Sequence, residues 1–179
     1  MIYCILGEGF EEAEAVSPVD ILRRGGLNVQ FAGVSSKNVK GAHNIEICCE
    51  TTVDKINAAE VEMLILPGGM KGVRSIEASR RALELIKSVY GAGNFVAAIC
   101  AAPTILGKLG IMKGVRGVCY PGMEADVDGM LPVPGSSSVR DGNIITGRAP
   151  GAALDFGFEL LRALKGEAEA VKIREDMVY

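Results

Sequence analysis

An uncharged run of strand-forming residues that ends in a cysteine is the feature that most constrains the fold of this chain. The segment 95–99 (Phe-Val-Ala-Ala-Ile) lacks polar alternation, which is typical of a central strand buried on both faces of a parallel sheet. Cys100 follows it directly, and small residues then begin a helix predicted over 101–109. Strand, sharp turn and helix in this order predict a nucleophile elbow with the thiol at the turn.

Strand and helix patterns alternate along the rest of the chain. Buried runs predict strands over 3–6, 27–32, 61–66 and 144–146, and a β-rich segment predicts a strand or ribbon off the main sheet over 45–52. Apolar spacing predicts helices over 11–24, from Ile76 to Tyr90, over 152–164 and in a short tail behind Gly166. The segment 121–138 is expected to be irregular, and Asp141-Gly142 to turn a hairpin.

This order of elements predicts an α/β protein with a mostly parallel sheet and helices on both faces. No internal repeat or interdomain linker interrupts the sequence, so one domain is expected over 1–179. In such a sheet, ligands bind beyond the carboxyl ends of the strands. Cys100 is expected at that edge.

Charge and hydropathy exclude several classes of function. The net charge is -3 and Lys and Arg are scattered, so neither a nucleic-acid surface nor a polybasic membrane patch is indicated. The apolar run over 95–107 is too short to span a bilayer. The first residues lack the basic segment and long apolar stretch of a signal peptide, so we expect a cytoplasmic protein.

The cysteines form no familiar disulfide or metal pattern. The chain has no CxxC, its one histidine, His43, has no obvious partner, and its five cysteines are Cys4, Cys48, Cys49, Cys100 and Cys119. We therefore expect neither a disulfide framework nor a structural metal site. His43 is expected to be solvated, and Cys4 to lie in the core.

Cys100 itself has two interpretations. A thiol at a helix N-terminus lies at the positive end of the helix dipole, which favours the thiolate and a reactive nucleophile. Cysteine is also one of the residue types most often packed in a core, where it has no chemical role. The residue pattern alone leaves both interpretations open.

An acidic segment, Gly7-Glu8-Gly9-Phe10-Glu11-Glu12-Ala13-Glu14, follows the first predicted strand. It does not fit a dinucleotide fingerprint, because the third glycine is missing and its carboxylates would repel a pyrophosphate. In one interpretation the carboxylates complement the N-terminus of the next helix. In the other, one carboxyl reaches Cys100 as a protonated acid that donates a hydrogen bond to the thiolate and later exchanges a proton.

Two further loops follow predicted strands. The main-chain N–H groups of Gly68 and Gly69, with that of Ala101, could form an oxyanion hole, although turn glycines without a function are common. Arg148 follows the strand over 144–146 and would bind either an anion near the site or a surface carboxylate. Tyr120 and Cys119 lie at another strand end and could approach the same site.

Taken together, these motifs resemble the ThiJ/PfpI superfamily, in particular its Parkinsonism-associated deglycase branch, often called DJ-one, including small bacterial members. The resemblance covers essentially the whole chain. Its ordered motifs are Gly9-Phe10-Glu11-Glu12-Ala13-Glu14, Pro18-Val19-Asp20, Arg23-Arg24-Gly25-Gly26, Leu66-Pro67-Gly68-Gly69, the segment from Ala97 to Pro103, and Thr146-Gly147-Arg148-Ala149-Pro150-Gly151. Each motif is weak alone, and the set is specific.

The resemblance implies a flavodoxin-like three-layer sandwich, a homodimer and no cofactor. It implies that Cys100 is the reactive cysteine and Glu14 its protonated partner. It assigns the anion-stabilising amides to Gly69 and Ala101, and it places Arg148 in a loop near the pocket on the dimer side.

Two positions depart from the family pattern. The branch often has a histidine where this chain has Tyr120, and tyrosine is a poor base near neutral pH, with a reference pKa of about 10. The proteolytic branch has a histidine directly after the cysteine, where this chain has Ala101. Without a neighbouring imidazole to activate the thiol, a peptidase is not expected.

The preferred hypothesis is an enzyme of glutathione-independent glyoxalase or deglycase type, acting on reactive aldehydes or early glycation adducts through Cys100 and Glu14. The alternative is a redox sensor or redox-regulated chaperone in which peroxide oxidises Cys100 to the sulfinate. Neither role implies a nucleic-acid or membrane partner.

Overall fold

The central element of the computed structural model, which describes residues 1–179, is a seven-stranded sheet. Its strands lie in the order β10–β11–β7–β6–β1–β2–β5, and every neighbouring pair is parallel except the hairpin of β10 and β11. Their bounds are β1 (Ile2–Leu6), β2 (Val29–Gly33), β5 (Thr51–Thr52), β6 (Met63–Leu66), β7 (Phe95–Ile99), β10 (Ser138–Asp141) and β11 (Ile144–Gly147).

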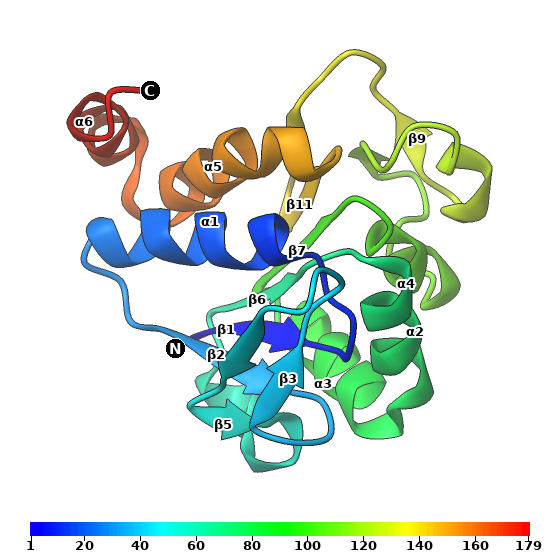
Figure 1. The fold of residues 1–179 in the computed structure, drawn as a ribbon. Coiled ribbons are helices and arrows are strands. Elements are labelled where there is room, and N and C mark those ends of the chain that lie inside the picture. The colour runs from blue at the N-terminus through cyan, green and yellow to red at the C-terminus, as the bar shows by residue number, and fades with distance from the viewer.

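Helices cover both faces of this sheet (Figure 1). On one face, α1 (Glu12–Arg24) and α5 (Ala153–Lys165) pack side by side, and α6 (Glu167–Asp176) follows α5. On the other face lie α2 (Met70–Ala78) and α3 (Arg80–Gly91), with α4 (Pro103–Lys108) joined to α2 by the ion pair between Lys108 and Glu77. The expected three-layer sandwich with a mostly parallel sheet is confirmed.

Short elements occupy the connections. Two small two-stranded sheets pair β3 (Asn38–Lys40) with β4 (Glu46–Cys48), and β8 (Arg116–Gly117) with β9 (Leu131–Pro132). Single turns of 3-10 helix cover Val53–Lys55, Ala58–Glu60, Glu124–Asp126 and Pro150–Ala152. The β3–β4 hairpin lies off the main sheet, as the β-rich pattern over 45–52 predicts, and β5 returns to the sheet edge.

One cluster of 50 buried side chains forms the hydrophobic core on both sides of the central strands. All four residues of β6 are fully buried, as are residues 96–99 of β7, which is consistent with the absence of polar residues from both strands. None of the helices has both the length and the apolar character needed to cross a bilayer.

The single helix predicted from Ile76 to Tyr90 is wrong, because the chain breaks there into α2 and α3. Ser79 adopts an extended conformation, and its side-chain oxygen accepts a 3.2 Å hydrogen bond from the N–H of Ala82. Serine in this role caps the start of a new helix. The apolar spacing continues across the break, so periodicity alone could not reveal it.

Candidate active site

The backbone at Cys100 forms a sharp turn at the carboxyl end of β7. Its φ of 65° lies in the left-handed region, which is unfavourable for a residue with a side chain. Two hydrogen bonds hold it there: Cys100 N–H donates to Gly147 O at 2.9 Å, and Tyr120 N–H donates to Cys100 O at 2.8 Å. The strands on one side and segment 119–121 on the other therefore fix the thiol at the ligand-binding edge of the sheet.

Glu14 lies beside this thiol, fully buried in the first turn of α1. Its Oε2 accepts a 2.7 Å hydrogen bond from Gly68 N–H, and the Cys100 thiol is the side-chain group that interacts with the carboxyl. Oε1 is buried and has no hydrogen-bond partner of good geometry. Because buried polar atoms are rarely left unpaired, this oxygen indicates a place for a proton or a ligand.

Gly68 brings the two side chains together because it has no side chain of its own. A Cβ at this position would lie 2.6 Å from Glu14 Oε2, 2.7 Å from Cys100 Cβ and 3.1 Å from Cys100 Sγ. Real Cβ atoms essentially never come as close to other atoms as the first two of these distances. The glycine is therefore required for the contact between the carboxyl and the thiol.

Burial dominates the electrostatics of the pair. It raises the pKa of Glu14 to about 7, against the opposing hydrogen bonds from Cys100 and Gly68. Burial, together with the negative charge of Glu14, raises the pKa of Cys100 to about 12, while the N–H groups of Ala101 and Gly69 lower it. Both shifts therefore have the same direction: burial favours the protonated form of the carboxyl and of the thiol.

The upward shift in the pKa of Cys100 is opposite to the downward shift expected for a thiol at a helix N-terminus. Helix α4 begins only at Pro103 and has six residues, so Cys100 lies before the first turn rather than on it. The favourable dipole that remains comes from the amides of Ala101 and Gly69, and desolvation outweighs it.

A cavity of about 380 Å³ opens onto the thiol. Gly69, Ala101 and Tyr120, all expected near the site, line it together with Cys100, whereas Gly68 and Glu14 lie buried behind. Arg148 is not part of this cavity and lines a neighbouring one. The remaining lining residues are Glu11, Met70, Pro121, Gly122, Met123 and Pro150.

The sequence singles out none of these six residues as a site candidate, and three of them show why. Glu11 lies three residues before Glu14, a spacing that places two residues on one side of a helix, so this signal was present. Met70 directly follows the glycine pair of the second loop. Met123 lies in the irregular segment 121–138, where no periodicity predicts which side chain faces the thiol.

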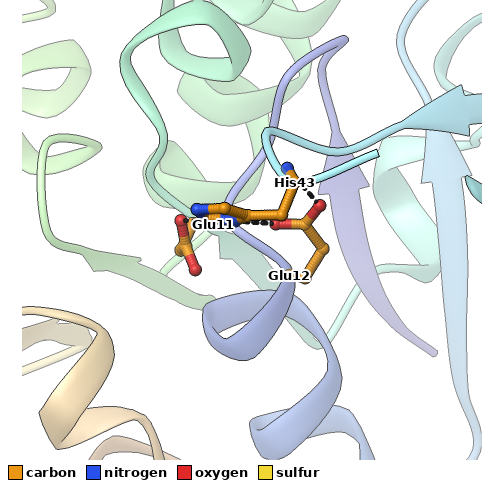
Figure 2. A group of neighbouring side chains, drawn as sticks. All are labelled: Glu11, Glu12 and His43. Carbon is orange, nitrogen blue, oxygen red and sulfur yellow. Dashed lines mark hydrogen bonds and ion pairs between the residues drawn. The ribbon is translucent and has the colours of Figure 1, made fainter. Parts of the chain in front are cut away.

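A second group of titratable side chains lies at the start of α1 (Figure 2). The imidazole Nδ1 of His43 lies 2.8 Å from Glu12 Oε2 and 3.7 Å from Glu11 Oε2, and His43 N–H donates to Glu12 Oε1 at 2.6 Å. The ring of His43 is exposed, as expected, and it also binds a carboxylate that the sequence did not indicate as its partner. The three residues are the one group close enough to hold a metal ion, but both oxygens of Glu12 already bind the loop that carries His43.

The other cysteines differ from Cys100 in their surroundings. All five are free, and Cys4, Cys49 and Cys119 are buried, which confirms the expectation for Cys4. Burial raises the pKa of Cys119 to about 11 and that of Cys49 to about 12. Cys48 is the exposed thiol.

A mostly parallel α/β sandwich with a cysteine on a strained strand-to-helix turn, backed by a buried glutamic acid, defines a class of flavodoxin-like proteins. The model of the DJ-1/PfpI family matches residues 1–163, and the chain belongs to this family.

Named relatives agree with this assignment. Protein dj-1beta of Drosophila melanogaster is 32% identical over 97% of this chain and 94% of its own, and the Parkinson disease protein 7 homolog of Danio rerio is 32% identical with the same shares. A protein named as a deglycase from Pyrococcus horikoshii is 29% identical over 87% of this chain and 94% of its own.

Solved structures extend the similarity to three dimensions. A DJ-1 superfamily protein from Salmonella typhimurium superposes with a TM-score of 0.95 at 30% identity, covering 99% of this chain and 97% of its own. The crystal structure of Drosophila melanogaster DJ-1beta gives a TM-score of 0.94 at 32% identity, covering 99% and 96%.

Proposed function

We propose that the protein is a cofactor-independent enzyme that converts reactive aldehydes, or their early adducts on amino groups, through a covalent intermediate on Cys100. The contact between Glu14 and Cys100, at the base of a cavity, carries this proposal. Relatives named as deglycases in two Pyrococcus species support it. A general base works best when its pKa lies near the operating pH, and burial raises the pKa of Glu14 to about 7.

In the first step, the sulfur of Cys100 attacks the aldehyde carbon of a 2-oxoaldehyde such as methylglyoxal. The Glu14 carboxylate takes the thiol proton as the carbon–sulfur bond forms. The aldehyde oxygen becomes an oxyanion that accepts hydrogen bonds from the N–H groups of Gly69 and Ala101. Glu14 then returns the proton it took from the thiol to this oxygen, which gives the hemithioacetal and leaves Glu14 ionised for the next step.

In the second step, Glu14 moves a proton within this intermediate. It removes the hydrogen on the sulfur-bearing carbon and returns a proton to the adjacent carbonyl carbon, while the two oxygens exchange hydroxyl and carbonyl character. The product is a thioester of a 2-hydroxy acid, with no external oxidant or reductant. Water then cleaves the carbon–sulfur bond, releasing the 2-hydroxy acid and the Cys100 thiol.

The test is conversion of methylglyoxal to lactate by the purified protein without glutathione. Cys100→Ala should abolish turnover, while Cys48→Ala, which removes an exposed thiol that does not line this cavity, should leave it unchanged. Equal activity of Cys100→Ala and the unmodified protein would reject the proposal.

A redox-sensing role is the second candidate, and the unpartnered Oε1 of Glu14 supports it. A protonated carboxyl at this place could donate a hydrogen bond to an oxygen of a Cys100 sulfinate. Mild peroxide should then oxidise Cys100 before the exposed Cys48, and peptide mass spectrometry of the treated protein measures the order of oxidation. Preferential oxidation of Cys48 would reject this role.

Cytoplasmic location and a homodimeric state are further parts of the proposal. The exposed apolar side chains of Val16 on α1 and Ile45 on the loop that follows His43 support self-association, which light scattering measures directly.

A further inference from the structure

A second cavity, of about 310 Å³, lies beside the Cys100 cavity. The two share Pro121, so segment 119–121 forms a wall between them. Cys119 and Arg148 line the second cavity, and its walls include Pro132 and Pro134, which limit backbone motion. Its volume falls at the lower end of the range for small-molecule sites, about 300–1,000 Å³.

Arg148 is the charged group that distinguishes this cavity. Only Arg148 and Arg162 among the arginines are half-buried. Arg162 pairs with Glu159 and Glu167, whereas the guanidinium of Arg148 makes no hydrogen bond or ion pair in the chain. A guanidinium carries five N–H donors, and no protein acceptor occupies those of Arg148, so they are available to a ligand.

Glu124 restricts which ligand fits. Its carboxylate lines the same cavity, accepts a 2.9 Å hydrogen bond from Gly122 N–H, and lies beyond ion-pair distance from Arg148. One guanidinium in the presence of one carboxylate favours a ligand with a single negative charge and disfavours a dianion such as phosphate. The planar guanidinium fork matches a carboxylate in a bidentate arrangement.

We propose that this cavity is a binding site for small monocarboxylates, in which Arg148 holds the carboxylate. The site is separate from the thiol cavity and goes beyond the proposed activity. The 2-hydroxy acids expected as products of that activity belong to the same chemical class, so lactate is a suitable probe.

The experiment is a ¹H–¹⁵N NMR titration with sodium lactate, with sodium chloride adjusted to keep the ionic strength constant. The amides of Val118 and Ser136, which line the cavity, should shift saturably. Arg148→Gln should weaken lactate binding by about tenfold or more, since it removes a charge-assisted bidentate contact. Arg74→Gln is the matched control, because Arg74 is exposed, has no ion-pair partner and does not line this cavity. This variant should leave the affinity for lactate unchanged.

Repeating the titration with Cys100→Ala separates this inference from the proposed function, because that variant cannot turn over aldehydes. Lactate should bind it as well as it binds the unmodified protein. Shifts confined to Gly69 and Ala101, equal affinity of Arg148→Gln, or tighter binding of phosphate than of lactate would each overturn the assignment.

Discussion

The main-chain N–H of Gly68 donates a 2.7 Å hydrogen bond to Oε2 of Glu14, on a helix 54 residues earlier in the chain. This bond fixes one oxygen of the carboxyl and leaves the other, Oε1, without a partner beside Cys100. The loop after β6 and the first turn of α1 therefore act together to position a single proton-exchanging group.

Replacing Glu14 by glutamine should change the reactivity and the turnover of Cys100 in opposite directions. Removing the negative charge lowers the pKa of the thiol from about 12, so alkylation by iodoacetamide at a fixed pH should become faster. Turnover of methylglyoxal should fall by about 100-fold or more, since glutamine cannot move a proton.

The pH dependence gives a further check on the same variant. Glu14 acts as a base only when ionised, so kcat/KM of the unmodified protein should rise as the pH increases through about 7. Glu14→Gln should remove this rise from the pH profile. Glu8→Gln, at an exposed position of the same acidic segment, serves as the control. Faster alkylation with unchanged turnover would contradict the proposed role of Glu14.

Gly68→Ala should disrupt the pair sterically. The added methyl group would lie 2.6 Å from Glu14 Oε2 and 2.7 Å from Cys100 Cβ, so one of them must move. We expect a loss of about 1–3 kcal/mol in the free energy of unfolding, measured with urea, and a loss of turnover. Gly91→Ala, where a Cβ meets nothing within 4 Å, should change stability by less than about 1 kcal/mol. Comparable stability of the two variants would show that the loop relaxes without cost.

The elements that the sequence predicts best are those whose burial leaves no choice of residue. Residues 95–99 are apolar because both faces of β7 are covered, and the hairpin turn follows from Gly142 with its φ of 59°. The break at Ser79 was missed because apolar spacing continues from α2 into α3. Polar side chains are also common within helices, and the capping bond of Ser79 became visible only in three dimensions.

The candidate site was predictable in its members but not in its electrostatics. Cys100, Glu14, Gly69 and Ala101 lie where the motifs place them. The upward shift in the pKa of the thiol depends on how completely the pair is buried, which no local pattern encodes. Arg148 was expected to bind either an anion near the thiol or a surface carboxylate. It lines a neighbouring cavity behind residues 119–121, and its side chain forms no ion pair in the chain.

His43 should titrate above its ordinary pKa of 6.5, because the Glu12 carboxylate accepts a hydrogen bond from the ring and Glu11 adds negative charge. Because the pKa of His43 is raised in the folded protein, this contact stabilises the protein fully at pH values below the ordinary histidine pKa of 6.5. The stabilisation is lost as the pH rises through the raised pKa of the folded protein. The pKa of Glu12 is lowered: burial opposes this direction, but the hydrogen bonds from His43 outweigh it. The contribution of Glu12 is therefore present above its ordinary value of 4.5 and is lost as pH falls through the lowered one.

This contact can be measured directly, since His43 is the one histidine of the chain. Its ring protons give an isolated NMR titration curve with a midpoint expected above 6.5. Glu12→Gln should move the midpoint back towards that value, while Glu8→Gln should leave it in place. A midpoint at or below 6.5 in the unmodified protein would mean that the ring does not bind Glu12 in solution.

Self-association is expected through the exposed apolar residues on either side of Glu12. Val16, 46% exposed, lies one turn after Glu12 on α1, and Ile45, 57% exposed, lies two residues after His43, which binds the Glu12 carboxylate. Multi-angle light scattering should give about twice the chain mass of 18.8 kDa. Val16→Glu should shift the protein towards the monomer, because the interface would bury an unpaired charge. Val171→Glu, at a valine of similar exposure on α6, should leave the dimer intact. A monomeric unmodified protein, or equal dissociation of both variants, would exclude an interface on this face.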